Sequence, residues 1–418
     1  MLFKNDKKII IGYDLANTCS QISYCYKKET DDVETVATVE GEENYDIPTV
    51  LCKRAGTNQW LFGHAALRFV GEHPEEGILV DNLLHLALDG EVVQIDGRGY
   101  HPAALLALFI KRSLSTVLKG GSVDKIAAIM FTCEEVDQKL GMLLQRIINT
   151  LELKNTEVFS QCYEESFFSY LTHQPKDLWQ CGALLLDYRG EELICVHVEG
   201  NVNTIPKVMY SAKRRCHFAG TDRELLDIAG EVCEGRQISS IYLIGEKFGG
   251  DWMNESLKYL CQGRRVFQGN NLYSKGACYT VWQKYGRKAD EEEAEEYLFL
   301  GPDKLKANIG MKVRKRGEEV YNALLDAGMC WNGMEEIFEF YLRGENHLEI
   351  MITPLVKAAP RLLFMELDGL VLGENEVTRV RMKLTMPREN LLTVTVCDLG
   401  FGEFREAHDG KWIKEVEL

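Results

Sequence analysis

The chain has 418 residues, of which 45% are hydrophobic and 27% are charged, which is the composition of a folded protein large enough for two or three domains. Its net charge of -16 opposes attraction to nucleic acid and to anionic lipid, so we expect no nucleic-acid partner and no membrane partner. Thirteen cysteines without C-x-x-C spacing argue against a zinc site and a disulfide framework. The N-terminus lacks the apolar core of a signal peptide, and no apolar run reaches membrane-spanning length. We therefore expect a cytoplasmic protein.

The first predicted element is a hairpin at residues 8–26. An apolar strand ends at Asp14, and Ala16, Asn17 and Thr18 form a short turn before a second β-prone run. A carboxylate in this place could hold hydrated Mg²⁺, which takes only one or two protein carboxylates and keeps several waters. Backbone N–H groups of the turn could contact phosphate. The same pattern is also typical of an ordinary turn residue.

Strands and helices then alternate, which predicts a sheet covered on at least one face. Residues 158–170 end this region and place Glu164 at the start of a helix, where it could face a ligand or cap the helix. The elements before it are strands at residues 33–39 and 126–131 and helices at residues 100–118 and 136–151.

A second hairpin, at residues 181–198, repeats the pattern of the first. Its apolar strand ends at Asp187, and a second strand follows the turn. Two hairpins, each with an Asp at the end of its first strand, are what a duplicated fold that holds Mg-nucleotide between its halves would have. This internal repeat of Asp14 by Asp187 is the strongest evidence that comes from the residues alone.

The turn of the second hairpin argues against phosphate binding. It contains one glycine, Gly190, followed by Glu191 and Glu192. Each glutamate would repel a triphosphate by on the order of a kcal/mol. Arg189 could compensate as a phosphate clamp, or it could lie in a solvated turn.

In this order, the segments resemble those of the actin, hexokinase and heat-shock-chaperone ATPases, and they are most similar to the seventy-kilodalton heat-shock chaperones. Three later segments add to the likeness. Residues 217–222 resemble a glycine-acidic helix start with Gly220, residues 241–248 an adenosine-binding strand end with Gly245, and residues 268–278 a closing helix with Gly276. The resemblance extends over about two thirds of the chain.

The resemblance implies an α/β actin-like domain, a duplicated ribonuclease H-like ATPase fold, that binds ATP or ADP with Mg²⁺. Asp14 and Asp187 would hold the metal and its waters, and Glu164 would help order the attacking water, so these three are the implied catalytic residues. Residues 77–84 lack the lysine that the family places near the γ-phosphate, and the family's adenosine-binding lobe is missing around residues 230–237. The implied nucleotide-binding residues are Ala16, Asn17, Thr18, Gly190, Gly220, Gly245 and Gly276.

The last third of the chain predicts a β-sandwich, because several strands alternate apolar and polar residues. We expect residues 1–288 to form the actin-like domain, 289–300 an acidic and apolar linker, and 301–418 a sandwich that resembles the chaperones' peptide-binding domain. Within the linker, residues 297–300 resemble the chaperones' interdomain linker or are the first strand of the next domain. The predicted strands are residues 337–342, 347–352, 361–370, 378–386 and 391–398.

Two functions of different classes follow. One is a chaperone-like ATPase that binds Mg-ATP between its lobes and a protein or peptide partner through its sandwich. The other is a catalytically inactive pseudo-ATPase that acts as a scaffold or interaction module, which the missing lysine, Glu191 and Glu192 favour. A small-molecule kinase of the same superfamily fits less well, because its sugar-binding segments are not visible. The sandwich could also serve packing or oligomerisation.

Overall fold

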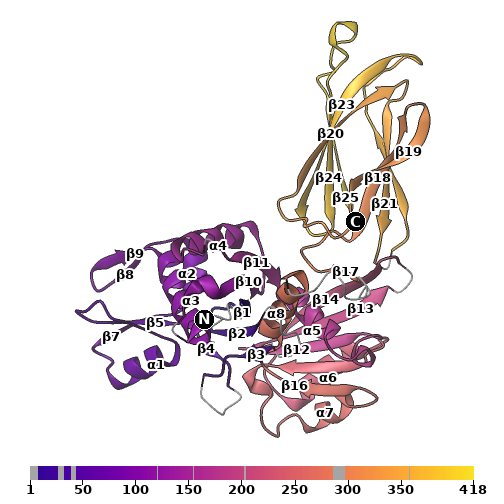
Figure 1. Cartoon of the computed structure of the whole chain (residues 1–418). Coiled ribbons are helices and arrows are strands. Elements are labelled where there is room, and N and C mark those ends of the chain that lie inside the picture. Colours follow the sequence, from indigo (N-terminus) through magenta and orange to yellow (C-terminus); the bar gives the residue numbers. More distant parts are fainter. Residues whose placement is uncertain are drawn as a thin grey trace, which may run out of the picture. The chain divides into compact units, whose positions relative to one another are not determined.

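The computed structural model describes residues 8–26, 33–38, 44–119, 121–153, 155–201, 204–285, 297–356 and 358–418. It is a mixed α/β protein with two compact units (Figure 1). Unit 1 comprises Met1–Glu199 and Ala212–Ala294, and unit 2 comprises Gly200–Ser211 and Glu295–Leu418. The N-terminal residues 1–7 and the predicted acidic linker at residues 289–296 lie outside the described residues.

The first sheet of unit 1 has the strand order β11-β10-β1-β2-β3. β1 (Ile9–Asp14) is antiparallel to β2 (Cys19–Tyr26) and parallel to β10 (Ile126–Cys133), which is parallel to β11 (Glu157–Cys162). The edge strand β3 is only Glu34–Thr35, shorter than the predicted strand at residues 33–39, whose last residue is outside the described part.

The two faces of this sheet have separate cores, as the period of two along a strand requires. Ile11 and Tyr13 pack with α3 (Pro102–Leu118) and α4 (Gln138–Thr150), whereas Ile10 packs against α8 (Leu272–Tyr285). β1 therefore lies between helices on both sides. This burial fixes the position of Asp14 at the end of the strand.

A small lobe is inserted between β2 and α3. Its three-stranded sheet has the order β6-β5-β7, formed by Trp60–Phe62, Leu51–Arg54 and Gly77–Val80. Before the lobe, β4 (Ile47–Pro48) pairs with β2 as a sixth strand of the first sheet. The other elements of the lobe are α1 (Gly63–Glu72), α2 (Leu83–Asp89), β8 (Val93–Ile95) and β9 (Arg98–Tyr100).

The second sheet of unit 1 repeats the topology of the first, with the order β16-β15-β12-β13-β14. β12 (Ala183–Arg189) is antiparallel to β13 (Glu192–Asn201) and parallel to β15 (Ser240–Ile244), and β15 is parallel to β16 (Arg265–Gln268). β12 thus has the place that β1 has in the first sheet. The remaining elements are β14 (Lys207–His217), α6 (Asp222–Cys233), α7 (Asn254–Leu260) and the short 3-10 helices Val123–Lys125, Lys176–Leu178 and Glu246–Phe248.

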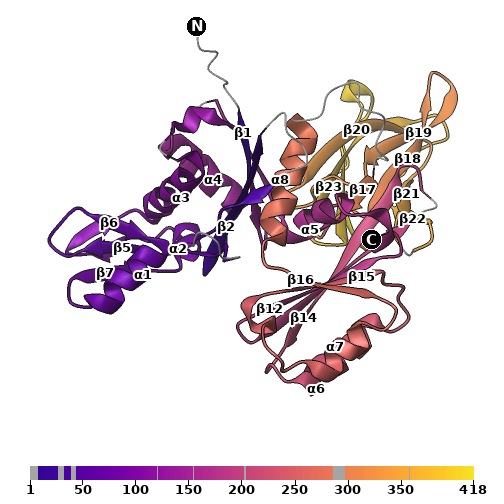
Figure 2. The same ribbon diagram turned by 60° about the horizontal axis from the view of Figure 1, so that its bottom comes forward.

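Two helices that follow equivalent strands pack against each other (Figure 2). α5 (Tyr163–Thr172) follows β11, and α8 follows β16. A Cβ added at Gly276 of α8 would collide with the carbonyl oxygen of Ser166 in α5, and one added at Gly12 would collide with the backbone of α8. Gly276, one of the implied nucleotide-binding residues, thus makes a close helix–helix crossing, and Gly12 makes a close approach of a strand to a helix.

Unit 2 is a sandwich of two four-stranded sheets, with the orders β19-β18-β21-β22 and β20-β23-β24-β25 (Figure 1). Alternate residues such as Val380, Met382 and Leu384 face the core between the sheets. The predicted sandwich is confirmed. The strands are Ala307–Lys315, Glu318–Leu325, Glu335–Arg343, His347–Pro354, Arg361–Glu366, Val377–Arg388, Leu391–Asp398 and Lys411–Glu417 for β18 to β25, with a 3-10 turn at Gly402–Phe404.

Residues 297–300, for which a linker was one of two alternatives, form the strand β17 (Tyr297–Leu300). β17 pairs in parallel with residues 207–210 of β14, which also count with unit 2. Across the described residues, no helix combines the length and apolarity needed to cross a membrane.

Candidate functional site

A cavity of about 790 Å³ lies in unit 1, where the turns of the two equivalent hairpins meet the first residues of α5 and α8. The structure brings Asp14 and Asp187 to this one cavity, although they are far apart in the chain. Five further residues predicted to bind nucleotide also line it, namely Ala16, Asn17, Thr18, Gly190 and Gly245.

Asp14 is buried at the end of β1, with 8% of its surface exposed. Its Oδ1 accepts a hydrogen bond of 2.7 Å from the Tyr163 hydroxyl. Burial raises the pKa of Asp14 to about 7, and it does so against the attraction of Arg189 and the Tyr163 hydrogen bond, which lower the pKa. The negative charge of Asp187 adds to the upward shift. This carboxyl therefore titrates near neutral pH.

Asp187 is even more deeply buried, at 2% exposure, and it has two donors. The Arg189 guanidinium forms an ion pair with Oδ2 of Asp187, and the Tyr273 hydroxyl donates a hydrogen bond of 2.9 Å to the same oxygen. Arg189 and Asp187 are two residues apart on β12, so their side chains lie on the same face of the strand. The local sequence of the hairpin therefore supplies the cation for its own aspartate.

Arg189 also packs on aromatic rings, so it is not the solvated turn residue that was one of the two alternatives, and its role as a phosphate clamp stays a prediction. Its guanidinium carbon lies 4.6 Å from the centroid of Tyr163 and 5.5 Å from that of Tyr273. The two rings stack with centroids 4.0 Å apart. Burial acts to lower the pKa of Arg189, but Tyr163 and Asp187 raise it further, so the net shift is upward and the side chain stays charged.

Tyr163 and Tyr273 are the residues of this site that sequence reasoning missed. Tyr163 is the first residue of α5, and Tyr273 is the second of α8. Each stands three residues before the point where the helices cross, at Ser166 and Gly276. The repeat is the signal that could have found them, because it places both tyrosines at equivalent positions opposite the two hairpins.

Glu164 does not reach the cavity lining and instead points to Lys213 of β14. It is 1% exposed, and its Oε1 lies 3.0 Å from the Lys213 Nζ. The structure thus shows Glu164 in a buried ion pair, and its role in ordering a water beside the two aspartates stays a prediction. Lys213 also lies 3.9 Å from Glu134, which pairs in turn with Arg215 at the cavity lining.

Two of the predicted nucleotide-binding glycines pack against Tyr188, and of these two only Gly245 also lines the cavity. Gly220 and Gly245 have φ angles of +85° and +108°, and a Cβ at either would collide with the hydroxyl or the carbonyl oxygen of Tyr188. These glycines let the backbone approach β12 closely. Gly190, with φ +57°, has open space around its Cα and is the turn residue that the left-handed conformation requires.

Mg-ATP is the cofactor that the resemblance implies, and the side chains of the cavity do not fit it. Arg189 already neutralises Asp187, and Oδ1 of Asp14 accepts the hydrogen bond of the Tyr163 hydroxyl. Asp46 and Glu135 also line the cavity and would repel a triphosphate, whereas the lining cations Arg215 and Lys247 already contact Glu134 and the carbonyl oxygen of Gly190. No hydrolytic step is assigned to this site.

Comparisons with known proteins identify a family. Residues 32–302 match the family model described as "Family of unknown function (DUF5716) C-terminal". The chain belongs to the DUF5716 family. Residues 304–418 match a second model, "Domain of unknown function (DUF8552)". No curated protein matches the chain. The DUF5716 match includes Tyr163, Asp187, Arg189 and Tyr273 but begins after Asp14.

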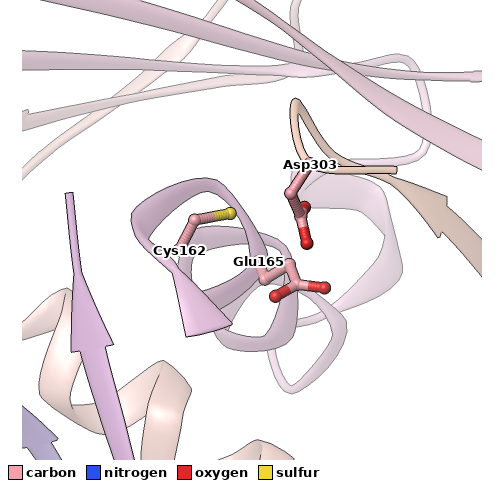
Figure 3. Close-up of side chains that lie close together, drawn as sticks. All are labelled: Cys162, Glu165 and Asp303. Carbon is pink, nitrogen blue, oxygen red and sulfur yellow. The ribbon is translucent and has the colours of Figure 1, made fainter. Parts of the chain in front are cut away.

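A second group of ligand-type side chains lies in the DUF5716 region, where β11 meets α5. The sulfur of Cys162 and a carboxylate oxygen of Glu165 lie within 4.8 Å of each other (Figure 3). Asp303, drawn with them, belongs to unit 2 and is not counted with this pair. Two side chains are fewer than the ligands that a structural metal centre uses, so no metal site is assigned here.

Proposed function

We propose that this DUF5716 member is a catalytically inactive relative of the heat-shock-chaperone ATPases, in which unit 1 is a scaffold and the sandwich of unit 2 binds a protein or peptide partner. The observation that carries the proposal is the position of Arg189. Its guanidinium pairs with Asp187 and stacks on Tyr163, whose hydroxyl binds Asp14. The positively charged Arg189 side chain thus lies beside the carboxylates that would otherwise bind Mg²⁺.

The proposed kinship rests on the repeat. Both sheets of unit 1 have the same strand order and the same pairing directions around β1 and β12. Each central strand ends in an Asp at one cavity, and each repeat ends in one of the two crossing helices. These features support an actin-like, duplicated ribonuclease H-like fold. The four-plus-four sandwich supports a likeness to the chaperones' peptide-binding domain.

The proposed inactivity rests on charge. In phosphoryl transfer, catalysis consists mainly of positioning and of cations aimed at the charge that develops on the transferred group. Here the cation nearest the aspartates is held by stacked tyrosines and by Asp187. Of the other cations that line the cavity, Arg215 pairs with Glu134, and Lys247 donates a hydrogen bond to the carbonyl oxygen of Gly190. A triphosphate would therefore be neutralised only if one of these cations left its partner within the protein.

The proposed partner role rests on the surface of the sandwich. Among the described residues, sixteen large hydrophobic side chains are exposed, and nine of them lie between Tyr321 and Ile413. Three of the nine are linked through their rings, because Phe401 contacts both Tyr341 and Phe404. Exposed apolar groups that gather in one unit are typical of a surface that meets another protein.

A second candidate is the Mg-ATP-dependent, chaperone-like protein. It is favoured by the volume of the cavity, about 790 Å³, and by the two aspartates and the polar turn residues Asn17 and Thr18 that line it. Binding would require Arg189 to leave Asp187. That exchange separates the two candidates, because only the second one predicts that Mg²⁺ competes with the arginine.

Steady-state phosphate release from Mg-ATP tests the proposal. The wild-type protein is expected to release phosphate no faster than a blank without protein, and Asp14→Asn is expected to match it. Release above the blank that is abolished by Asp14→Asn would overturn the inactive reading and favour the second candidate. A control at Asp89, an exposed Asp on α2, shows whether loss of any surface carboxylate changes a background activity.

A further inference from the structure

The strand β20 is a long edge strand of the sandwich without the usual protections of an edge. It is the first strand of the sheet β20-β23-β24-β25, and all nine of its residues pair with β23 without a register shift. Its sequence, Glu-Glu-Ile-Phe-Glu-Phe-Tyr-Leu-Arg, contains neither proline nor lysine. Such an edge offers a row of backbone N–H and C=O groups to another strand.

The other edge strands of the sandwich carry features that oppose strand addition. Lys411 and Lys414 lie on β25, and Lys414 Nζ donates a hydrogen bond of 2.7 Å to the carbonyl oxygen of Phe364 on β22. The pairing of β18 with the edge strand β19 shifts register between Ile309 and Gly310. Lysines and register irregularities are common protections of an edge strand. β20 has neither.

The outer face of β20 is self-complementary when the strand pairs with an antiparallel copy of itself. With the two-fold axis between the two copies of Glu339, all nine residues of each strand have a partner. In this register Glu335 lies opposite Arg343 of the second copy, and Ile337 lies opposite its Tyr341. Each pair occurs twice, because a two-fold interface is isologous. Opposite charges and aliphatic–aromatic contacts are cross-strand pairs that stabilise antiparallel strands.

The central pair of this register joins two like charges, and both are already neutralised. The two Glu339 side chains lie opposite each other at the axis, and each keeps its own ion pair of 2.6 Å with Arg381 of β23. The central row across the two sheets therefore contains Arg, Glu, Glu and Arg and has no net charge. Glu335 keeps its ion pair of 2.7 Å with Lys383 and gains Arg343 of the second copy on its other side.

The inner face of β20 adds an apolar contact in the same register. Phe338 and Phe340 are half-buried and pack on the core of the sandwich. On this face Phe338 lies opposite Phe340 of the second copy, so pairing covers both rings. Glu336 is exposed and lies opposite Leu342 of the second copy, near the two ends of the ladder. The contacts at the centre of the inner face are therefore apolar.

Other registers of the same pairing lack this complementarity. Displacing one copy by two residues in either direction puts Ile337 opposite Glu339 or Arg343, and it also shortens the ladder. The same displacements put Tyr341 opposite Glu335 or Glu339. Displacement by one residue would bring outer-face residues opposite inner-face residues. The axis at Glu339 is thus the register in which charge and apolarity both match.

The charges of the edge favour a second copy over a segment of one charge sign. The outer face of β20 and β23 carries more cations than carboxylates, namely Arg343, Arg379, Arg381 and Lys383 beside Glu335 and Glu339. A basic segment would therefore meet an excess of positive charge, and an acidic one would meet the glutamates of β20. A second copy brings both signs, each to a place where the opposite sign or an ion pair faces it.

We infer that two copies of this chain associate through β20, antiparallel and with the two-fold axis at Glu339, so that their β20-β23-β24-β25 sheets form one continuous sheet. The two backbones supply the ladder of hydrogen bonds, as in other cases of strand addition. The inference goes beyond the proposed function and does not depend on it, so phosphate release from Mg-ATP bears on the scaffold alone.

Sedimentation velocity of the full chain over a range of protein concentrations tests the dimer. The wild type is expected to sediment as a reversible monomer–dimer mixture. Ile337→Lys should raise the dissociation constant by about tenfold or more, because it puts a lysine opposite Tyr341 and beside Lys383. Ile413→Lys is the matched control and should leave the constant unchanged. Ile413 is 58% exposed and lies in the same cross-strand row of the sheet, on β25 at the opposite edge.

An exchange of charges tests the register. Glu335→Arg and Arg343→Glu should each weaken self-association by about tenfold, because two pairs of like charges then face each other in the dimer. An equimolar mixture of the two variants should associate about as tightly as the wild type, because an Arg–Glu pair forms at both ends of the mixed ladder. The two variants serve as their own controls in the mixture, so a loss of stability would not produce the recovery.

Cysteine cross-linking locates the axis. Glu339→Cys should give a disulfide-linked dimer on mild oxidation, since opposite residues of antiparallel strands have Cα atoms about 4.5–5.5 Å apart, within disulfide range. Glu335→Cys is the control, because its two copies would be about 27 Å apart at about 3.4 Å of rise per residue. The wild type, in which Cys181, Cys261 and Cys330 are exposed, gives the background.

Four results would overturn the inference. They are a wild-type chain that stays monomeric at every concentration, equal self-association of the Ile337→Lys and Ile413→Lys variants, a mixture of the charge variants that associates no better than either alone, and cross-linking at residue 335 in place of 339. The first result would leave the edge to a different partner, and the last two would reject the register.

Discussion

Arg189 and the two aspartates decide what the cavity of unit 1 can do. A buried carboxylate is costly unless it is paired or protonated. Asp187 meets this requirement with Arg189 and Tyr273, whereas Asp14 has the Tyr163 hydroxyl and a raised pKa. The two aspartates occupy equivalent places in the repeat, but Asp187 is stabilised by an ion pair, whereas Asp14 has a hydrogen bond and a raised pKa. Removing Arg189 would leave Asp187 buried with one neutral donor.

The raised pKa of Asp14 predicts a pH dependence of stability. In the unfolded chain its pKa is near 3.8, and in the folded protein it is about 7. Between these values the folded state keeps a proton that the unfolded state has lost, so the free energy of unfolding falls as the pH rises through this window. The loss can reach about 4 kcal/mol, since each pH unit of difference corresponds to about 1.4 kcal/mol.

Urea unfolding of the wild type and of Asp14→Asn between about pH 5 and about pH 7.5 measures this term, because the asparagine cannot titrate. The variant should gain stability relative to the wild type as the pH rises. Parallel stability profiles for the two proteins would show that Asp14 titrates at the same pH in the folded and unfolded states.

The sequence pattern predicted that Asp14 and Asp187 lie close together, but it did not predict which side chains contact them. Asp14 and Asp187 meet at one cavity because each ends the central strand of an equivalent sheet, and hydrophobic runs mark such strands clearly. The partners were not visible, because Tyr163 and Tyr273 reach the site through a helix crossing. The direction in which Glu164 points stayed open for a related reason. A helix start has two sides, and spacing alone does not tell which one faces the cavity.

The crossing of α5 and α8 is the element-scale feature on which the cavity depends. Both tyrosines stand one turn before the crossing, so the distance between the helix axes sets how closely the rings stack. The approach is possible because Gly276 has no side chain to separate the helix from Ser166. Gly12 allows the same closeness between α8 and β1.

Gly276→Ala should therefore destabilise the protein by about 1–3 kcal/mol or more, because the new methyl group forces the helices apart. Gly141→Ala is the matched control. Gly141 lies in α4 with nothing near the place of an added Cβ, so alanine there should stabilise by about 0.5–1 kcal/mol through its better helix propensity. Thermal or urea unfolding distinguishes the two. Similar small effects in both variants would contradict the close crossing.

Most elements could be predicted from periodicity, and the exceptions have identifiable causes. The helix at residues 100–118 and the alternating strands of the sandwich match α3 and β20 to β24 because burial on one face imposes a period on the sequence. β3 is shorter than its alternating pattern, as an edge strand has only one neighbour to hold it. The sequence did not decide whether residues 297–300 form a linker or a strand, because the pairing of β17 with β14 is a tertiary contact.

In the proposed function of the whole molecule, unit 1 is a scaffold and unit 2 binds a protein or peptide partner. The net charge of -16 favours basic partners over nucleic acid. The repeat within unit 1 brings Asp14 and Asp187 to one cavity, and Arg189 supplies a positive charge beside Asp187 there. Under the proposed function, the two hairpins keep this arrangement without a metal.

The central claim is that Arg189 takes the place of Mg-nucleotide between Asp14 and Asp187. Calorimetric titration with a non-hydrolysable ATP analogue in the presence of Mg²⁺ tests it most directly, on the wild type and on Asp187→Ala. The account predicts weak or absent heat that is equal in the two proteins. Tight, Mg²⁺-dependent binding by the wild type that is lost in Asp187→Ala would contradict it.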